Sequence, residues 1–333
     1  MGLTQRVVQI LGAGHPEPCI CGRMLLPLEP LIPETAMVIR SLLYAPGNEP
    51  RKLTRVGTFG ADGVILDLED SVPMEQKVAA RATVREAVSR AGTEGARVHV
   101  RVNPTGRKTG FSVDHGAADI AAVVRPELDG LVLPKVESAE ELNQIESVIA
   151  QAERENGIRE GSLEVTPLIE SAAGLWNAYE IARGSPRVRV LHFGAADFTR
   201  DLGIDWSRNE TEVGYARSRL AVISRAAGIE PPIDSPWVRL DDDDGLAGSI
   251  AEARRLGFQG KLCIHPRQVE IVNRGFSSVS TEALVHARKV VEAFSEAESR
   301  GSASIVVDGQ FIDYPMVEKA RRTIEFHAKA EGE

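Results

Sequence analysis

Glu164-Val165-Thr166-Pro167-Leu168-Ile169 and Val188-Arg189-Val190-Leu191-His192-Phe193 are apolar runs with the length and β-branched content of buried strands. The first run is followed by Glu170, and the second leads into Gly194-Ala195-Ala196-Asp197. Residues 172–181 between them have helical spacing. Two parallel strands joined by a helix place Glu170 and Asp197 on neighbouring strands at the same end of a sheet. We therefore expect the two carboxylates to lie close together.

Two interpretations of this acidic pair stay open at this point. Mg²⁺ prefers oxygen ligands and commonly takes one or two carboxylates, with water and substrate in its remaining positions. Glu170 and Asp197 would then form a two-carboxylate magnesium site. Alternatively, both acids are helix caps or solvated strand ends, which need no metal.

The unit of strand followed by helix recurs along the chain. Further strands are predicted at residues 37–44, 63–70, 97–103, 130–135, 232–234 and 260–266. Eight such units in roughly 230 residues match a (β/α)₈ TIM barrel in number and size. The alternative, a doubly wound open sheet, lacks its phosphate loop, because Gly12-Ala13-Gly14 does not belong to a full GxGxxG motif. We predict an α/β fold with the catalytic barrel over residues 37–276.

Two segments lie outside the eightfold pattern. Residues 1–36 are dense in glycine and proline and predict an irregular N-terminal extension. Residues 277–333 predict a long amphipathic helix, a hairpin-like pair of strands around Asp308-Gly309 and a final helix. We expect this C-terminal helical arm to act as a lid or as an interface.

Composition and charge narrow the function classes. The net charge of −9 argues against nucleic acid or an anionic membrane as the main partner. No apolar run approaches the roughly 20 residues that span a bilayer, and the N-terminus lacks a secretory signal pattern. The three cysteines are too few for a disulfide framework, and Cys19-Ile20-Cys21 has no second pair for structural zinc. These features predict a cytoplasmic enzyme.

The barrel prediction points to a catalytic mouth, because TIM-barrel active sites lie at the C-terminal ends of the strands. Polar residues gather at nearly every predicted strand end: Arg40, Ser41, Asp67, Glu69, Asp70, Arg101, Asn103, Lys135, Glu170, Asp197, Asp234 and His265. One such end is routine, since helix caps prefer Asp, Asn and Ser. So many together predict a site.

Three other features have competing interpretations. Lys135 at a strand end could form a Schiff base, but Glu69 and Glu137 favour an ion-paired lysine. His265, which precedes a proline, is interpreted mainly as structural. The four aspartates at 241–244 are typical of a solvated loop, and no metal is assigned to them.

Taken together, the strand-end motifs resemble the citrate lyase β-chain and malyl-CoA lyase family, within the HpcH/HpaI aldolase/citrate lyase superfamily. The motifs that carry the resemblance are at residues 40–47, 65–72, 101–103, 133–137, 168–171, 193–198, 226–229, 260–266 and 309–315. They occur in order over residues 40–322, whereas residues 1–37 have no recognised counterpart.

This resemblance implies a Mg²⁺-dependent enzyme that breaks or forms a carbon–carbon bond next to a CoA thioester. Glu170 and Asp197 match the metal ligands of the family. Arg101 matches the arginine that grips the carboxylate of the small oxo or hydroxy acid. Glu69 and Asp70 match acids that support the water shell of the metal.

Two more residues take roles from the resemblance. Arg40 matches a residue that lines the mouth near the acyl-CoA. Asp313 matches an aspartate that comes from the C-terminal arm of a neighbouring subunit and acts as acid/base. A homo-oligomer, a trimer or a hexamer, is therefore implied. Three functions remain open: a free-standing lyase for malyl-, citramalyl- or citryl-CoA, a citryl-CoA lyase subunit of a citrate lyase complex, and a thioesterase acting on the same esters.

Overall fold

The computed structural model describes residues 39–105, 115–277 and 281–331. Eight parallel strands hydrogen-bond in sequence order and close on themselves, since β1 pairs with both β2 and β8. The strands are β1 (Ser41–Pro46), β2 (Gly63–Asp67), β3 (Arg97–Arg101), β4 (Gly130–Leu133), β5 (Glu164–Ile169), β6 (His192–Phe193), β7 (Ile233–Asp234) and β8 (Gly260–Cys263). The predicted TIM barrel is therefore confirmed.

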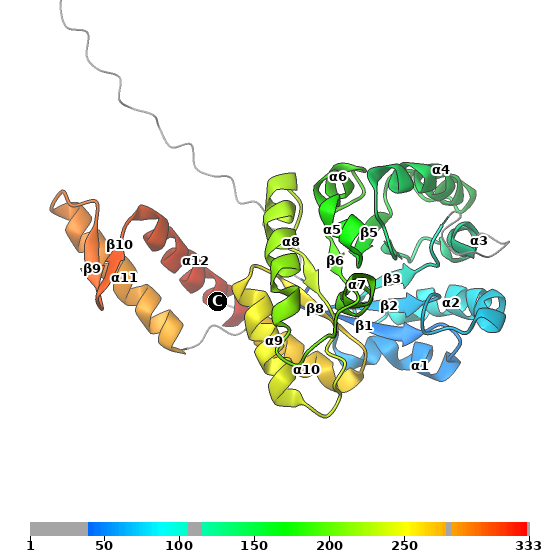
Figure 1. Cartoon of the computed structure of the whole chain (residues 1–333), viewed down its shortest axis with the longest axis horizontal. Helices are drawn as coiled ribbons and strands as arrows, with labels where there is room; N and C mark the ends of the chain where they lie inside the picture. The colour runs from blue at the N-terminus through cyan, green and yellow to red at the C-terminus, as the bar shows by residue number, and fades with distance from the viewer. Residues whose placement is uncertain (1–38, 106–114, 278–280, 332–333) are drawn as a thin grey trace, which may run out of the picture. The chain divides into compact units, whose positions relative to one another are not determined.

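Helices connect the strands and surround the barrel (Figure 1). They are α1 (Pro50–Arg55), α2 (Lys77–Ala91), α3 (His115–Val123), α4 (Ala139–Glu155), α5 (Ala172–Trp176), α6 (Ala178–Arg183), α7 (Ala195–Leu202), α8 (Gly214–Ala227), α9 (Asp243–Arg255) and α10 (Pro266–Ser277). Short 3₁₀ turns cover η1 (Val56–Phe59), η2 (Met74–Gln76) and η4 (Thr211–Val213). Within the described ranges, every helix is too short or too polar to span a bilayer.

The barrel has two apolar layers because each strand is covered on both faces. Side chains of one parity fill the interior, where Leu42, Ile65 and Val132 belong to a compact inner cluster. Side chains of the other parity pack under the helices in a larger outer cluster that includes Leu66 and Leu131. This alternation decides which strand-end side chains point toward the mouth.

Strand β2 ends earlier than predicted. The prediction of strand over residues 63–70 is wrong beyond Asp67, because its carboxylate accepts hydrogen bonds from the backbone N–H groups of Glu69 (3.0 Å) and Ser71 (3.1 Å). Such side-chain acceptors turn the chain out of the sheet. The helix predicted over residues 172–181 is divided at Asn177, whose Nδ2 donates to the Glu137 carbonyl at 2.8 Å.

The C-terminal part has a small core of its own. Helix α11 (Thr281–Ser299), strands β9 (Ile305–Val307) and β10 (Gln310–Ile312), and helix α12 (Tyr314–Glu331) pack around a cluster that includes Phe294. The predicted hairpin is confirmed: β9 and β10 are antiparallel, and Asp308 and Gly309 both have positive φ, at 50° and 79°. Two such residues are typical of a type I′ turn. The predicted N-terminal extension over residues 1–36 lies outside the described residues.

Candidate active site at the barrel mouth

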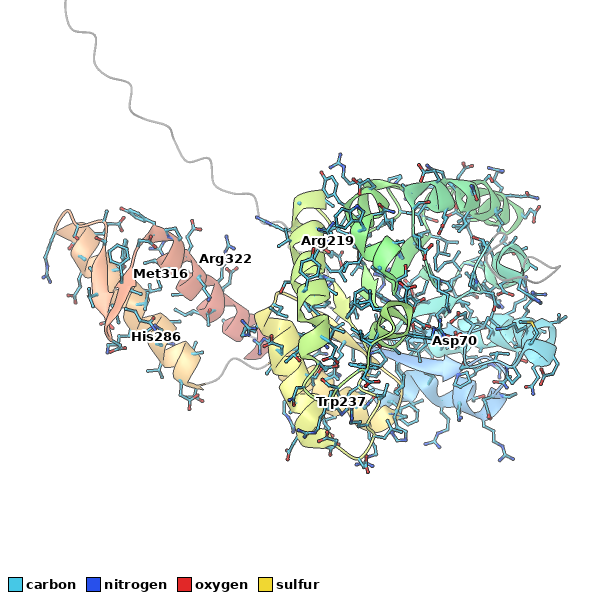
Figure 2. The ribbon with its side chains drawn as sticks, in the orientation of Figure 1. Asp70, Arg219, Trp237, His286, Met316 and Arg322 are labelled. Carbon is cyan, nitrogen blue, oxygen red and sulfur yellow. The ribbon has the colours of Figure 1, made fainter. Side chains whose placement is uncertain are left out.

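The ends of β2, β3, β4, β5 and β6 surround a cavity of about 530 Å³. Asp70 marks its position in the barrel (Figure 2). Its lining is strongly acidic. Among the described residues, the lining holds six carboxyl groups and three basic side chains: Glu69, Asp70, Glu137, Glu170, Asp197 and Asp201 against Lys77, Lys135 and Arg200. A cation would be electrostatically favoured here.

Glu170 is the most buried acid of the described lining. It follows the last residue of β5 and is 3% exposed. Burial raises the pKa of Glu170 to about 8. The positive charge of Lys135 opposes this rise, and the carboxyl groups of Asp197 and Glu69 add to it. The end of β6 fits closely around it: a Cβ at Gly194 would lie 2.6 Å from Glu170 Oε2. Only glycine lets the two strand ends approach this far.

The orientation of Glu170 is determined by its neighbours. The backbone N–H of Lys135 donates to Glu170 Oε1 at 2.8 Å. Lys135 has φ of +55°, an unusual conformation for a residue with a Cβ. Behind Glu170, the N–H of Ala172 donates to Asp201 Oδ2 at 2.8 Å. Since Asp201 and Asp197 both belong to α7, this hydrogen bond connects the segment that carries Glu170 to the helix that carries Asp197.

Arg101 is held rigidly beside the cavity. Its Nε and Nη2 donate to the two oxygens of Asp67 at 2.6 and 2.7 Å, as their direct pairing across β2 and β3 allows. Its Nη1 lies 2.9 Å from Glu69, and its guanidinium carbon lies 4.9 Å from the centre of the Tyr44 ring. One bidentate edge of Arg101 is therefore taken by Asp67, and Nη1 on the other edge contacts Glu69. An incoming carboxylate would compete with Glu69 for this donor.

Lys135 is an ion-paired lysine. Its Nζ contacts Glu69 directly and lies 3.6 Å from Asp70. Burial would lower the pKa of Lys135, but Glu69 and Glu170 outweigh it and hold the pKa above its usual value. A Schiff-base nucleophile needs the opposite shift. The charged, ion-paired interpretation therefore fits the geometry.

The structure brings seven of the residues predicted at strand ends to the mouth. Arg101 contacts Glu69 at the edge of the cavity, and the cavity is lined by Glu69, Asp70, Asn103, Lys135, Glu170 and Asp197.

Two further residues are placed elsewhere. Arg40 precedes the first residue of β1, at the barrel end opposite the mouth, and pairs with Asp62 (2.6 Å) and Ser277 (2.8 Å). The prediction that Arg40 lines the mouth is therefore wrong. Asp313 does not belong to the lining of the cavity. Its backbone carbonyl accepts from Val317 at 3.0 Å in the first turn of α12.

Asp234 and His265 do not contribute to the cavity lining either. Asp234 lies on the outward face of β7, where it pairs with Arg217 (2.8 Å) and Lys261 (2.5 Å) in a buried network. Its expected position in the mouth is wrong, because the inward residue of this short strand is Ile233. His265 accepts a hydrogen bond from the Arg267 N–H at 3.2 Å, which agrees with a structural role.

Tyr44, Arg200 and Asp201 are among the mouth residues that escaped the sequence analysis. Tyr44 has the same parity as Leu42, so alternation along β1 could have placed it inside. Arg200 and Asp201 follow Asp197 by one helical turn, so helical spacing could have placed them on the same face.

The donor set fits Mg²⁺ better than a metal held wholly by side chains. Among the described residues, no three His, Cys, Asp or Glu side chains are arranged to hold one ion together. The pair Glu170 and Asp197 supplies hard oxygen donors whose mutual repulsion a divalent cation would relieve. Mg²⁺ commonly uses one or two carboxylates and leaves its other positions to water and substrate.

Comparison with known proteins finds a matching family model and similar proteins of named function. Residues 40–266 match the model of the HpcH/HpaI aldolase/citrate lyase family. The chain is 36% identical over 286 residues to the citrate lyase subunit beta of Leuconostoc mesenteroides subsp. cremoris, covering 86% of this chain and 92% of that protein. It is 31% identical over 298 residues to the L-malyl-CoA/beta-methylmalyl-CoA lyase of Cereibacter sphaeroides, covering 84% and 92%.

The fold is also similar to solved structures, as one example shows. Protein CitE from Mycobacterium tuberculosis, in complex with magnesium, acetoacetate and coenzyme A, superposes with a TM-score of 0.69 at 27% identity. The match covers 89% of this chain and 99% of that one.

Proposed function

Since the chain belongs to the HpcH/HpaI aldolase/citrate lyase family, we propose that it is a Mg²⁺-dependent carbon–carbon lyase for a β-hydroxyacyl-CoA. The substrates are esters such as malyl-, citramalyl- or citryl-CoA, and the products are acetyl-CoA or a related acyl-CoA and a 2-oxo acid. The observation that supports it is the meeting of Glu170 and Asp197 in one cavity beside Arg101.

Glu170 and Asp197 would hold the Mg²⁺, with Glu69 and Asp70 supporting its water shell. When bound, the ion would coordinate the carboxylate of the acid half and its adjacent oxygen, which lowers the cost of negative charge on that oxygen. The protein would supply the rigidity. The N–H of Lys135 donates to Glu170 at 2.8 Å, and the N–H of Ala172 donates to Asp201 at 2.8 Å. These two hydrogen bonds restrain the segment that carries Glu170 against the helix that carries Asp197.

Arg101 would orient the acid half. Its guanidinium is fixed by Asp67 and stacked on Tyr44, so little side-chain freedom is lost when a carboxylate takes the place of Glu69 at Nη1. A carboxylate held there fixes the position of the neighbouring reacting carbon. This restraint favours the aligned geometry that bond cleavage needs.

Asp313 from a neighbouring subunit would act as acid/base. In the cleavage direction, a base takes the hydroxyl proton and the carbon–carbon bond breaks to a carbonyl and a thioester enolate, which is then protonated. Asp313 is flanked in the C-terminal part by exposed apolar side chains, among them Phe311 (60%) and Tyr314 (50%). Exposed aromatic side chains of this kind are typical of interfaces. They support a homo-oligomer, a trimer or a hexamer, in which the arm contacts another copy.

A second candidate is a citryl-CoA lyase subunit within a citrate lyase complex. The 36% identity to a citrate lyase subunit beta favours it. The chemistry at the mouth would be the same, but the acyl group would arrive on a carrier protein. Activity of the isolated chain on CoA esters separates the two candidates.

The test is a product assay with purified full-length protein, Mg²⁺ and a panel of malyl-, citramalyl- and citryl-CoA. Oxo acid and free CoA are followed together, with Glu170→Gln as the control because it keeps the shape and removes the charge. Oxo acid from the wild type but not from the variant supports the lyase. Free CoA without oxo acid would replace it with a thioesterase.

A further inference from the structure

Arg200 is a cation at the cavity whose role the proposed reaction does not use. It lies on α7, one turn beyond Asp197, and its side chain is 73% exposed. Its Nη2 is 2.5 Å from Asp197 Oδ1. Among the described residues, Asp197 is its one ion-pair partner. Exposed pairs of this kind contribute little stability, so the guanidinium can exchange this partner for another anion.

The other basic side chains of the cavity are already committed. Lys77 Nζ donates to the carbonyls of Leu68 and Glu69 at 2.9 and 2.7 Å. Lys135 is paired with Glu69 and Asp70. Of the basic residues that the structure describes in the lining, Arg200 therefore has the most exposed side chain, and the described carboxyl groups outnumber these cations.

A bound divalent cation would free Arg200. If Asp197 ligates Mg²⁺, as the proposed function requires, its charge is shared with the metal and its hold on Arg200 weakens. The guanidinium stays close, because it is anchored one helical turn from the ligand. An anion that binds at the metal through one end would present its other end to Arg200. A guanidinium fork recognises a carboxylate through two parallel hydrogen bonds.

We propose that Arg200 is a specificity-determining residue that binds the distal carboxylate of a dicarboxylic 2-oxo acid, so that the site favours this class over monocarboxylic 2-oxo acids. The inference rests on the proposed function. The alternative anion, a phosphate of CoA, lies a whole pantetheine arm away from the reacting carbon. The carboxylate near the metal is therefore the nearer partner.

The test compares oxaloacetate with pyruvate, which differ by one carboxylate. Binding of each to the intact protein with saturating Mg²⁺ is measured by titration calorimetry. We expect the wild type to bind oxaloacetate at least about tenfold more tightly, as one charge-assisted pair allows. Arg200→Ala should bring the ratio close to one, and Arg200→Lys should keep part of it. The matched control is Arg255→Ala, which removes another exposed arginine paired three residues away, with Glu252, on α9.

Several outcomes would overturn the inference. The first is an unchanged affinity ratio of oxaloacetate to pyruvate in Arg200→Ala, and the second is an equal loss of affinity for both acids in that variant. The third is no binding of either acid to the wild type. The fourth is an Arg200→Ala variant that loses affinity for acetyl-CoA and for neither acid. A separate Mg²⁺ titration should show equal or tighter binding in Arg200→Ala. Weaker Mg²⁺ binding would instead mean that Arg200 orients Asp197, and would also overturn it.

The binding experiment needs no turnover, so the two proposals fail separately. A preference for oxaloacetate that depends on Arg200, without any oxo acid released from CoA esters, would overturn the lyase alone. Lyase activity with a preference that Arg200→Ala leaves intact would overturn the role of Arg200 alone.

Discussion

The backbone N–H of Lys135 points at the carboxylate of Glu170, 2.8 Å from Oε1, and Lys135 adopts a φ of +55° in that position. A left-handed backbone is costly for a residue with a Cβ. Lys135, the residue whose N–H orients the candidate metal ligand Glu170, therefore carries backbone strain.

This relationship predicts an unusual order of stabilities at position 135. Lys135→Ala and Lys135→Gly both lose the ammonium group, and both keep the N–H that contacts Glu170. We expect the glycine variant to be more stable than the alanine variant by about 1 kcal/mol, because glycine tolerates the left-handed backbone. Chemical denaturation measures the difference. A more stable alanine variant would show that the backbone carries no such strain.

A second prediction concerns Asp67, which is fully buried and holds Arg101 through two hydrogen bonds. Asp67→Asn should destabilise the protein by about 3 kcal/mol, because it removes the bidentate carboxylate from a buried guanidinium and leaves Glu69 as its close counter-charge. Arg101→Lys keeps a cation but loses the planar fork. It should lower kcat/KM by at least about tenfold.

Denaturation midpoints and steady-state kinetics of the two variants separate stability from activity. Wild-type-like stability in Asp67→Asn, or unchanged kcat/KM in Arg101→Lys, would contradict this account of the cluster.

The barrel interior predicts a dependence of stability on pH. His99 and His192 alternate with outward-facing valine, leucine and phenylalanine, so both lie inside the barrel, where both are buried. Burial lowers the pKa of each to about 3, with Arg97 adding to the effect at His99 and His99 adding to it at His192. The unfolded chain therefore takes up protons between about pH 6.5 and 3 that the folded chain does not.

Stability should consequently fall as the pH is lowered through this window, by up to about 1.4 kcal/mol per pH unit for each histidine. The free energy of unfolding of the wild type and of His192→Gln, measured from pH 7 to pH 4, checks this. The variant should show the shallower decline. Parallel curves would mean that His192 is protonated in the folded protein.

The number and order of the strands were predictable from the sequence, because apolar runs with polar ends repeat with barrel spacing. Their exact ends were not, since β2 stops at Asp67 where Asp67 itself accepts backbone hydrogen bonds. The sequence did not show which end of the barrel, or which face of its strand, each polar residue occupies. Arg40 was assigned to the mouth through the resemblance of its motif, whereas it precedes Ser41, the first residue of β1, at the other end of the barrel. Asp234 belongs to a strand too short for alternation to show which face is inward. The left-handed backbone of Lys135 leaves no trace in composition, since it is determined by the tertiary contact with Glu170.

The last prediction tests whether Asp313 serves a site on another subunit. Asp313→Ala and Glu170→Gln should each be nearly inactive in the pure form. Mixed oligomers should recover activity, because an Asp313→Ala subunit keeps its Glu170 and an adjacent Glu170→Gln subunit supplies the aspartate. In the whole mixture, random mixing of equal amounts should restore about one quarter of wild-type activity, the share of sites that receive both intact residues, and isolated mixed oligomers should exceed this share. Co-expression with two different affinity tags isolates the mixed oligomers for assay. Inactive mixed oligomers, with both tags present, would contradict action between subunits and place Asp313 outside the chemistry of a neighbouring mouth.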